Sequence, residues 1–133
     1  MKACFADTYF YLALLNPADE AHQVAASLNR TLAAPMVTTT WVLTEVADAL
    51  SAPGNRTVFL ELLAALRGDP QVSIIPPSPT LFDRGIDLYR ARLDEDWSLT
   101  DCVSFVVMGE YALTDALTGD HHFEQAGFRA LMK

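Results

Sequence analysis

Short apolar runs alternate with segments of helical spacing along the whole chain. Apolar, partly β-branched runs predict strands, and these lie at 1–7, 36–39, 72–75, 112–117 and 128–131. Apolar positions at helical spacing predict helices, and these lie at 8–15, 20–33, 40–51, 56–67, 80–92 and 101–111. Asp19, Asn55 and either Ser98 or Thr100 stand where helix caps are expected. Strands that alternate with helices favour an α/β fold, a parallel sheet covered on both faces.

Length and composition favour one globular domain covering 1–133. The chain has 133 residues, of which 51% are hydrophobic, so it can bury a substantial core. No apolar run reaches the roughly 18 residues needed to cross a bilayer, and the first seven residues do not form a signal peptide. We therefore expect a cytoplasmic protein without a membrane segment. Cys4 and Cys102 each lie in an apolar segment and are expected to be buried, unpaired thiols.

Four carboxylates occupy positions where an ionised group is unfavourable. Asp7 and Asp120 follow predicted strands, Glu45 interrupts an apolar helical stripe, and Asp101 opens an apolar helix. Buried carboxylates need a cation or hydrogen bonds, and the carboxyl ends of parallel strands are where such sheets bind ligands. If the four converge, a hard divalent metal is the natural counter-charge. Asp96, close to Asp101 in the chain, is a secondary candidate.

Each of these acids also has a purely structural interpretation. Asp7 can cap the following helix, Asp101 can favour a helix dipole, and Asp120 can belong to a turn. Glu45 can lie at the edge of its stripe and reach solvent. The joint placement of the four therefore carries the metal-site hypothesis, because no single position does.

The charge balance limits how this protein can meet nucleic acid. Nine Lys and Arg residues stand against seventeen Asp and Glu residues, a net charge of −8. This argues against binding through a large basic surface, but it permits a nuclease whose metal ions supply the positive field. Arg84, Arg90 and Arg92 lie on or near one predicted helix and fit either an RNA contact or ordinary solvated charge.

Other site chemistries fit the sequence poorly. His121 and His122 suggest zinc, but adjacent residues of an extended chain point to opposite sides and no third ligand is suitably spaced. Hydrolase nucleophile motifs and Gly-rich phosphate loops are absent from the sequence. A phosphatase that uses a strand-end Asp needs a second Asp where Tyr9 stands and a late Lys, and the only lysines are Lys2 and Lys133.

Four segments together resemble the PIN domain family, most closely the VapC-type toxins of prokaryotic toxin–antitoxin pairs. They are the strand end at Asp7-Thr8, the stretch 38–45 that leads to Glu45, the stretch 98–102 around Asp101, and the stretch 117–123 around Asp120. The segment 123–128 also looks like the ending of a PIN subgroup. The motifs stand in the family's order and cover nearly the whole chain.

The resemblance implies a three-layer α/β/α fold with a central, mainly parallel sheet of about five strands. It also implies an endoribonuclease that depends on Mg²⁺ or Mn²⁺ and leaves a 5′-phosphate and a 3′-hydroxyl. The implied catalytic residues are Asp7, Glu45, Asp101 and Asp120, with Asp7, Asp101 and Asp120 as metal ligands. The residues that would bind substrate are Thr8, Thr39, Thr40 and His121.

The same resemblance implies biological partners. A VapC-type toxin cleaves RNA, is neutralised by a small VapB-like antitoxin, and forms a homodimer. Two other roles fit the same fold: a housekeeping RNA-processing PIN nuclease, or a catalytically silent PIN interaction module. The presence of all four acids favours an active nuclease, and a short upstream reading frame for a DNA-binding protein would favour the toxin.

Overall fold

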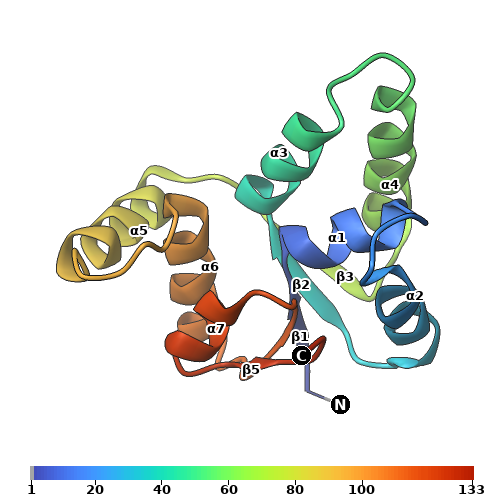
Figure 1. Ribbon diagram of the computed structural model, residues 1–133. Coiled ribbons are helices and arrows are strands. Elements are labelled where there is room, and N and C mark those ends of the chain that lie inside the picture. The colour runs from blue at the N-terminus through green and yellow to red at the C-terminus, as the bar shows by residue number, and fades with distance from the viewer. Residues whose placement is uncertain (1) are drawn as a thin grey trace.

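The computed structural model describes residues 2–133, which form a β-sheet with helices packed against it (Figure 1). The strands are β1 (Cys4–Ala6), β2 (Met36–Thr39), β3 (Val72–Ile75), β4 (Asp115–Leu117) and β5 (Arg129–Ala130). The helices are α1 (Thr8–Leu15), α2 (His22–Thr31), α3 (Thr40–Ala49), α4 (Arg56–Gly68), α5 (Pro79–Ala91), α6 (Leu99–Glu110) and α7 (His121–Gln125).

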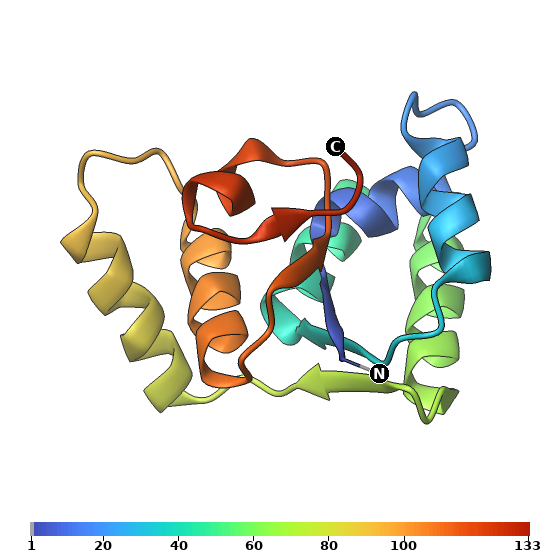
Figure 2. The ribbon, with the colours of Figure 1, turned by 90° about the horizontal axis from the view of Figure 1, so that it is seen from below.

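All described strand pairs are parallel, and the sheet order is β3-β2-β1-β4-β5. In Figure 2, α5 and α6 lie on one side of the sheet, while α1, α2 and α4 lie on the other. The predicted three-layer fold with about five parallel strands is therefore confirmed. Within residues 2–133, no helix is long and apolar enough to cross a membrane.

The order of the strands creates a switch point between β1 and β4. From β1 the chain builds outward through β2 to β3, and it then returns to the other side of β1 for β4 and β5. Ala6 pairs with Leu117 in the parallel register, so both strands end at the same height. Their carboxyl ends form the crevice in which open α/β sheets bind ligands. Asp7 leaves β1 there, and its backbone N–H donates to the Leu117 carbonyl at 3.3 Å.

A cluster of aromatic rings lies beneath this edge of the sheet. Phe123 of α7 is fully buried and packs edge-on against Phe105 of α6, with ring centroids 4.9 Å apart. Phe105 in turn meets Trp97, from the α5–α6 loop, at 5.0 Å, and Phe5 of β1 lies 6.2 Å from Phe123. Such pairs add about 0.5–1.5 kcal/mol each beyond their buried area. The cluster thus fixes four separate segments relative to one another.

Several predicted boundaries shift for identifiable reasons. The helix predicted from residue 20 begins at His22, because the Asp19 carboxylate accepts from the Ala21 N–H in a preceding turn and caps nothing. The strand predicted from 112 begins at Asp115, because Ala112 adopts a left-handed φ of 54° where α6 ends. Within the strand predicted for 1–7, residues 4–6 pair in the sheet, and Met1 lies outside the described residues.

Helix α7 is an addition to the predicted pattern, which placed no helix or strand between residues 117 and 128. Its five residues are too few to show helical periodicity.

Ser98 is the cap of α6, whereas Asn55 occupies the cap position of α4 without a side-chain bond. Cys4 and Cys102 are buried and free, as predicted.

Candidate metal centre

A pocket of about 360 Å³ opens at the carboxyl edge of β1 and β4. The four predicted carboxylates line it together with Thr8, Asp96 and His122. Among the described residues that line this pocket, none is Lys or Arg. Acids that are distant in the sequence therefore share one concave site, and no Lys or Arg side chain among the lining residues balances their charge.

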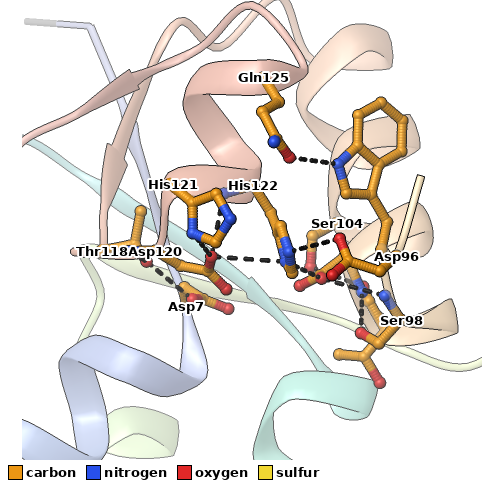
Figure 3. Close-up of polar contacts among 12 residues, drawn as sticks. Asp7, Asp96, Ser98, Ser104, Thr118, Asp120, His121, His122 and Gln125 are labelled. Carbon is orange, nitrogen blue, oxygen red and sulfur yellow. Dashed lines mark hydrogen bonds and ion pairs between the residues drawn. The ribbon is translucent and has the colours of Figure 1, made fainter.

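Asp7 is the most deeply buried of the four acids, with 4% of its surface exposed. It stands at the cap position of α1, but its side chain makes no capping bond. Instead, Asp7 Oδ2 accepts from the Thr118 hydroxyl at 2.9 Å (Figure 3). Burial raises the pKa of Asp7 to about 7, and the Thr118 hydrogen bond opposes this rise while the charges of Asp101 and Asp120 add to it.

Asp101 is held by the start of its own helix. Ser98 and Asp101 form a reciprocal capping box, in which Asp101 Oδ2 accepts from the Ser98 N–H at 3.1 Å. The same oxygen lies 3.1 Å from His122 Nδ1. Burial raises the pKa of Asp101; the Ser98 N–H opposes this, and the charge of Asp120 adds to it.

Asp120 begins α7 as its cap. Its Oδ1 accepts from the His122 N–H at 2.9 Å, and its own N–H donates to the Thr118 hydroxyl oxygen at 3.0 Å. Thr118 thus bridges Asp7 and Asp120. Among hydrogen bonds of the described residues, Oδ1 of Asp101 and Oδ2 of Asp120 accept none, so one oxygen of each carboxylate is anchored and the other is free.

Glu45 reaches the pocket from α3. Its Oε1 accepts from the Thr8 hydroxyl at 2.7 Å, a bond between the first residue of α1 and the middle of α3. Thr8, which was predicted to bind substrate, therefore lies in the pocket wall and orients Glu45.

Three other predicted substrate residues are not among those that line the pocket. Thr39 is buried and caps α3 by accepting from the Val42 N–H at 3.1 Å, while the Thr40 hydroxyl donates to the Ile75 carbonyl at 3.3 Å. Neither threonine lines the pocket. His121 is exposed at the rim, with Nδ1 3.6 Å from Asp120 Oδ1.

The prediction that His121 and His122 point to opposite sides of the chain was wrong. It assumed an extended chain, but His121 and His122 open a helix, and both rings lie beside Asp120. The donor atoms of these three residues lie within 4.8 Å of one another. Thr118 was not singled out from the sequence. Its position could have indicated it, because Thr118 directly follows a buried strand, as Asp7 does.

The three arginines considered for RNA binding are each paired with an acid. Arg84 contacts Glu110, Arg90 lies 3.2 Å from Asp87, and Arg92 lies 3.0 Å from Asp94. Arg92 also lies over the Trp97 ring, 5.0 Å from its centroid. These contacts match the interpretation of ordinary helix-surface charge.

Together, the sheet order, the flanking layers and the acidic pocket at the switch point define a PIN-like α/β protein. The structure matches VapC20 of Mycobacterium tuberculosis, described as a sarcin-ricin loop cleaving toxin, with a TM-score of 0.85 and 26% identity over 94% of this chain and 95% of that chain. It also matches FitAcB from Neisseria gonorrhoeae, with a TM-score of 0.63 and 17% identity over 96% and 95% of the two chains, a likeness of fold alone.

No protein-family model matches the chain, and no curated protein matches its sequence. The predicted resemblance to PIN-domain, VapC-type toxins is thus confirmed through structure.

Proposed function

We propose that this chain is a Mg²⁺- or Mn²⁺-dependent endoribonuclease in which Asp7, Asp101 and Asp120 hold the metal. The observation that carries the proposal is the convergence of these acids in one pocket that no described Lys or Arg lines. Buried carboxylates that crowd together are unfavourable without a cation. Burial, with the charges of Asp101 and Asp120, raises the pKa of Asp7 to about 7, so the ionised form of this carboxyl is unfavourable in the pocket.

The donor set fits a hard divalent ion. Mg²⁺ and Mn²⁺ favour carboxylate oxygens, and Asp101 and Asp120 each direct an anchored oxygen to the protein and keep the other free. A bound divalent ion supplies an activated water near neutral pH and positive charge for the phosphate. In this assignment the protein's own part is to orient the carboxylates, and hydrogen bonds from Thr118 and Ser98 do so.

Glu45 has a separate role in this proposal. Thr8 fixes one of its oxygens, so Glu45 stands at the pocket wall with a defined orientation. It positions the attacking water or holds a second ion. His121, exposed at the rim, is available to a phosphate of the RNA.

We further propose that the nuclease is the toxin of a type II toxin–antitoxin pair acting in the cytoplasm. The 26% identity to VapC20 over nearly the whole of both chains supports this role, since VapC20 is described as a sarcin-ricin loop cleaving toxin. The proposed partners are a small VapB-like antitoxin and a second copy of this chain. The net charge of −8 complements a basic antitoxin segment.

Cleavage assays with purified protein test the nuclease. A sarcin–ricin loop oligonucleotide, ribosomal RNA and transfer RNA are incubated with Mn²⁺ or Mg²⁺, and the ends of the products are mapped. Wild type should leave 5′-phosphates, EDTA should abolish cleavage, and Asp101→Asn should lower the rate by ~100-fold or more. Asp83→Asn, which removes an exposed charge of α5, is the matched control and should cleave normally.

Expression of the chain in bacteria tests the toxin role. Induction should arrest growth in the wild type and not in the Asp101→Asn variant. Cleavage that persists in EDTA or in Asp101→Asn would refute the metal mechanism. RNA cleavage without growth arrest would instead favour a housekeeping nuclease.

A further inference from the structure

His122 lies among three carboxylates contributed by three segments. Its Nδ1 is 3.1 Å from Asp101 Oδ2 and 3.4 Å from Asp120 Oδ1, and its Nε2 is 3.1 Å from Asp96 Oδ1 (Figure 3). Only 16% of the side chain is exposed. This ring therefore belongs to the interior of the acidic site, whereas its neighbour His121 is 62% exposed.

The position of His122 is set by contacts that do not involve the acids' free oxygens. Its N–H donates to Asp120 Oδ1, the capping bond of α7. The next residue, Phe123, is fully buried in the aromatic cluster. Gln125, at the end of α7, accepts from the Trp97 indole N–H at 3.1 Å, which ties the helix to the α5–α6 loop (Figure 3). The imidazole is thus presented to Asp101 by a helix anchored at both ends.

The two ring nitrogens of His122 are not equivalent. Nδ1 makes a hydrogen-bond contact with Asp101 Oδ2, and because an ionised carboxylate only accepts, Nδ1 carries the proton in that contact. Nε2 is buried and, within residues 2–133, has no hydrogen-bond partner, since its contact with Asp96 lacks the required geometry. Nδ1 is therefore the nitrogen through which His122 can act on Asp101.

Two donors converge on one oxygen of Asp101. Oδ2 accepts from the Ser98 N–H and faces His122 Nδ1, both at 3.1 Å. The backbone bond alone belongs to a capping box and would allow the carboxylate plane to tilt. With the second donor on the same oxygen, the plane is held and Oδ1 remains the oxygen without a protein donor. Outer partners of this kind set the orientation of metal-binding side chains.

We propose that His122 is a positioning residue, whose Nδ1–H holds Asp101 Oδ2 so that Asp101 Oδ1 faces the metal. This inference rests on the proposed function, because it assigns His122 to the same metal site. It makes His122 neither a metal ligand nor an acid or base of the reaction. The positioning requires only a donor at the location of Nδ1.

Substitutions that move the donor distinguish this role from others. The amide nitrogen of Asn falls near the place of Nδ1, whereas that of Gln falls near the place of Nε2. We expect His122→Asn to retain Mn²⁺ affinity, and His122→Gln and His122→Ala to lose 10- to 100-fold, measured by isothermal titration calorimetry with Mn²⁺ alone. Rates of RNA cleavage at saturating Mn²⁺ should follow the same order.

His22→Ala is the matched control. His22 Nδ1 also lies 2.9 Å from an oxygen, the Ala13 carbonyl, but it lies on α2 outside the pocket. Its loss should lower thermal stability and leave Mn²⁺ affinity unchanged. Thermal unfolding of every variant is recorded. If His122→Ala does not fold, the comparison rests on His122→Gln, which retains the bulk of the side chain.

The outcomes separate this inference from the proposed function. Equal Mn²⁺ affinity in wild type, His122→Gln and His122→Ala would overturn the positioning role and leave the metal site intact. An equal loss in Asn, Gln and Ala would also overturn it, since the imidazole itself would then be required. If wild type binds no Mn²⁺ or Mg²⁺, the proposed metal site fails, and the positioning role fails with it.

Discussion

At the scale of single residues, Asp7 shows how the fold sets the chemistry of one carboxyl. The strand–helix junction would allow it to cap α1, yet the tertiary structure directs it to Thr118, 111 residues away in the sequence. Burial and neighbouring acids raise its pKa to about 7, above its ordinary value of 3.8. Without metal, the ionised form of Asp7 therefore opposes folding.

This opposition gives the metal-free protein a defined pH dependence. The folded state binds the Asp7 proton more tightly than the unfolded state does. The contribution of Asp7 to the stability of the protein is therefore most favourable below pH 4, and it declines as the pH rises to about 7. Asp7→Asn, which mimics the protonated acid, should stabilise the metal-free protein by roughly 2–4 kcal/mol at pH 8 and by little at pH 4. Urea unfolding in EDTA at both pH values measures this.

The control for this comparison is Asp83→Asn, an exposed acid outside the pocket, which should show no such dependence. An Asp7→Asn variant that is less stable than wild type at pH 8 would contradict a strained site.

At the scale of elements, the close pairing of α5 and α6 depends on one glycine. A Cβ on Gly85 would lie 2.6 Å from Val103 Cγ2 and 3.6 Å from Val103 Cα. Val103 is fully buried, and its branched side chain has few other rotamers. The two helices can therefore approach only where Gly85 leaves space.

Gly85→Ala should accordingly destabilise the protein by about 1–3 kcal/mol through overpacking. Gly109→Ala is the matched control, because a Cβ there meets nothing within 4 Å and α6 should gain helix propensity of up to ~1 kcal/mol. Chemical unfolding of both variants provides the measurement. Similar free energies of unfolding for the two variants would exclude close packing at Gly85.

At the scale of the whole molecule, acidity and metal binding are linked. A net charge of −8 disfavours compaction, and several of those charges gather in one pocket. A ligand that binds only the folded state adds RT ln(1 + [L]/Kd) to its stability. Metal binding should therefore be visible as increased stability of the entire fold.

Mn²⁺ at one hundred times its Kd should stabilise the wild type by about 2.7 kcal/mol, measured as a reversible rise of the melting temperature that EDTA removes. Asp101→Asn should respond much less, while Asp83→Asn should respond like wild type. An equal rise in all three proteins would indicate binding outside the pocket.

Sequence reasoning located most of the fold and the four acids, because both depend on local patterns. Apolar runs predicted strands such as 72–75, which the structure contains with the same bounds. The four acids stood out because each opened, interrupted or followed an apolar segment, and all four line one pocket. Thr39 and Thr40 were implied by the family resemblance, but the Thr39 hydroxyl oxygen caps α3 and the Thr40 hydroxyl donates to the Ile75 carbonyl of β3, next to β2 in the sheet.

What the sequence by itself determined is the alternation of strands and helices and the position of acids at strand ends, because burial of apolar side chains follows periods of two and 3.6 residues. Only the tertiary structure decided that α7 forms, that Thr118 bridges two acids and that His122 meets Asp101. These depend on contacts between distant segments: a five-residue helix leaves no periodic trace, and an oxygen is anchored or free only once its neighbours are assembled.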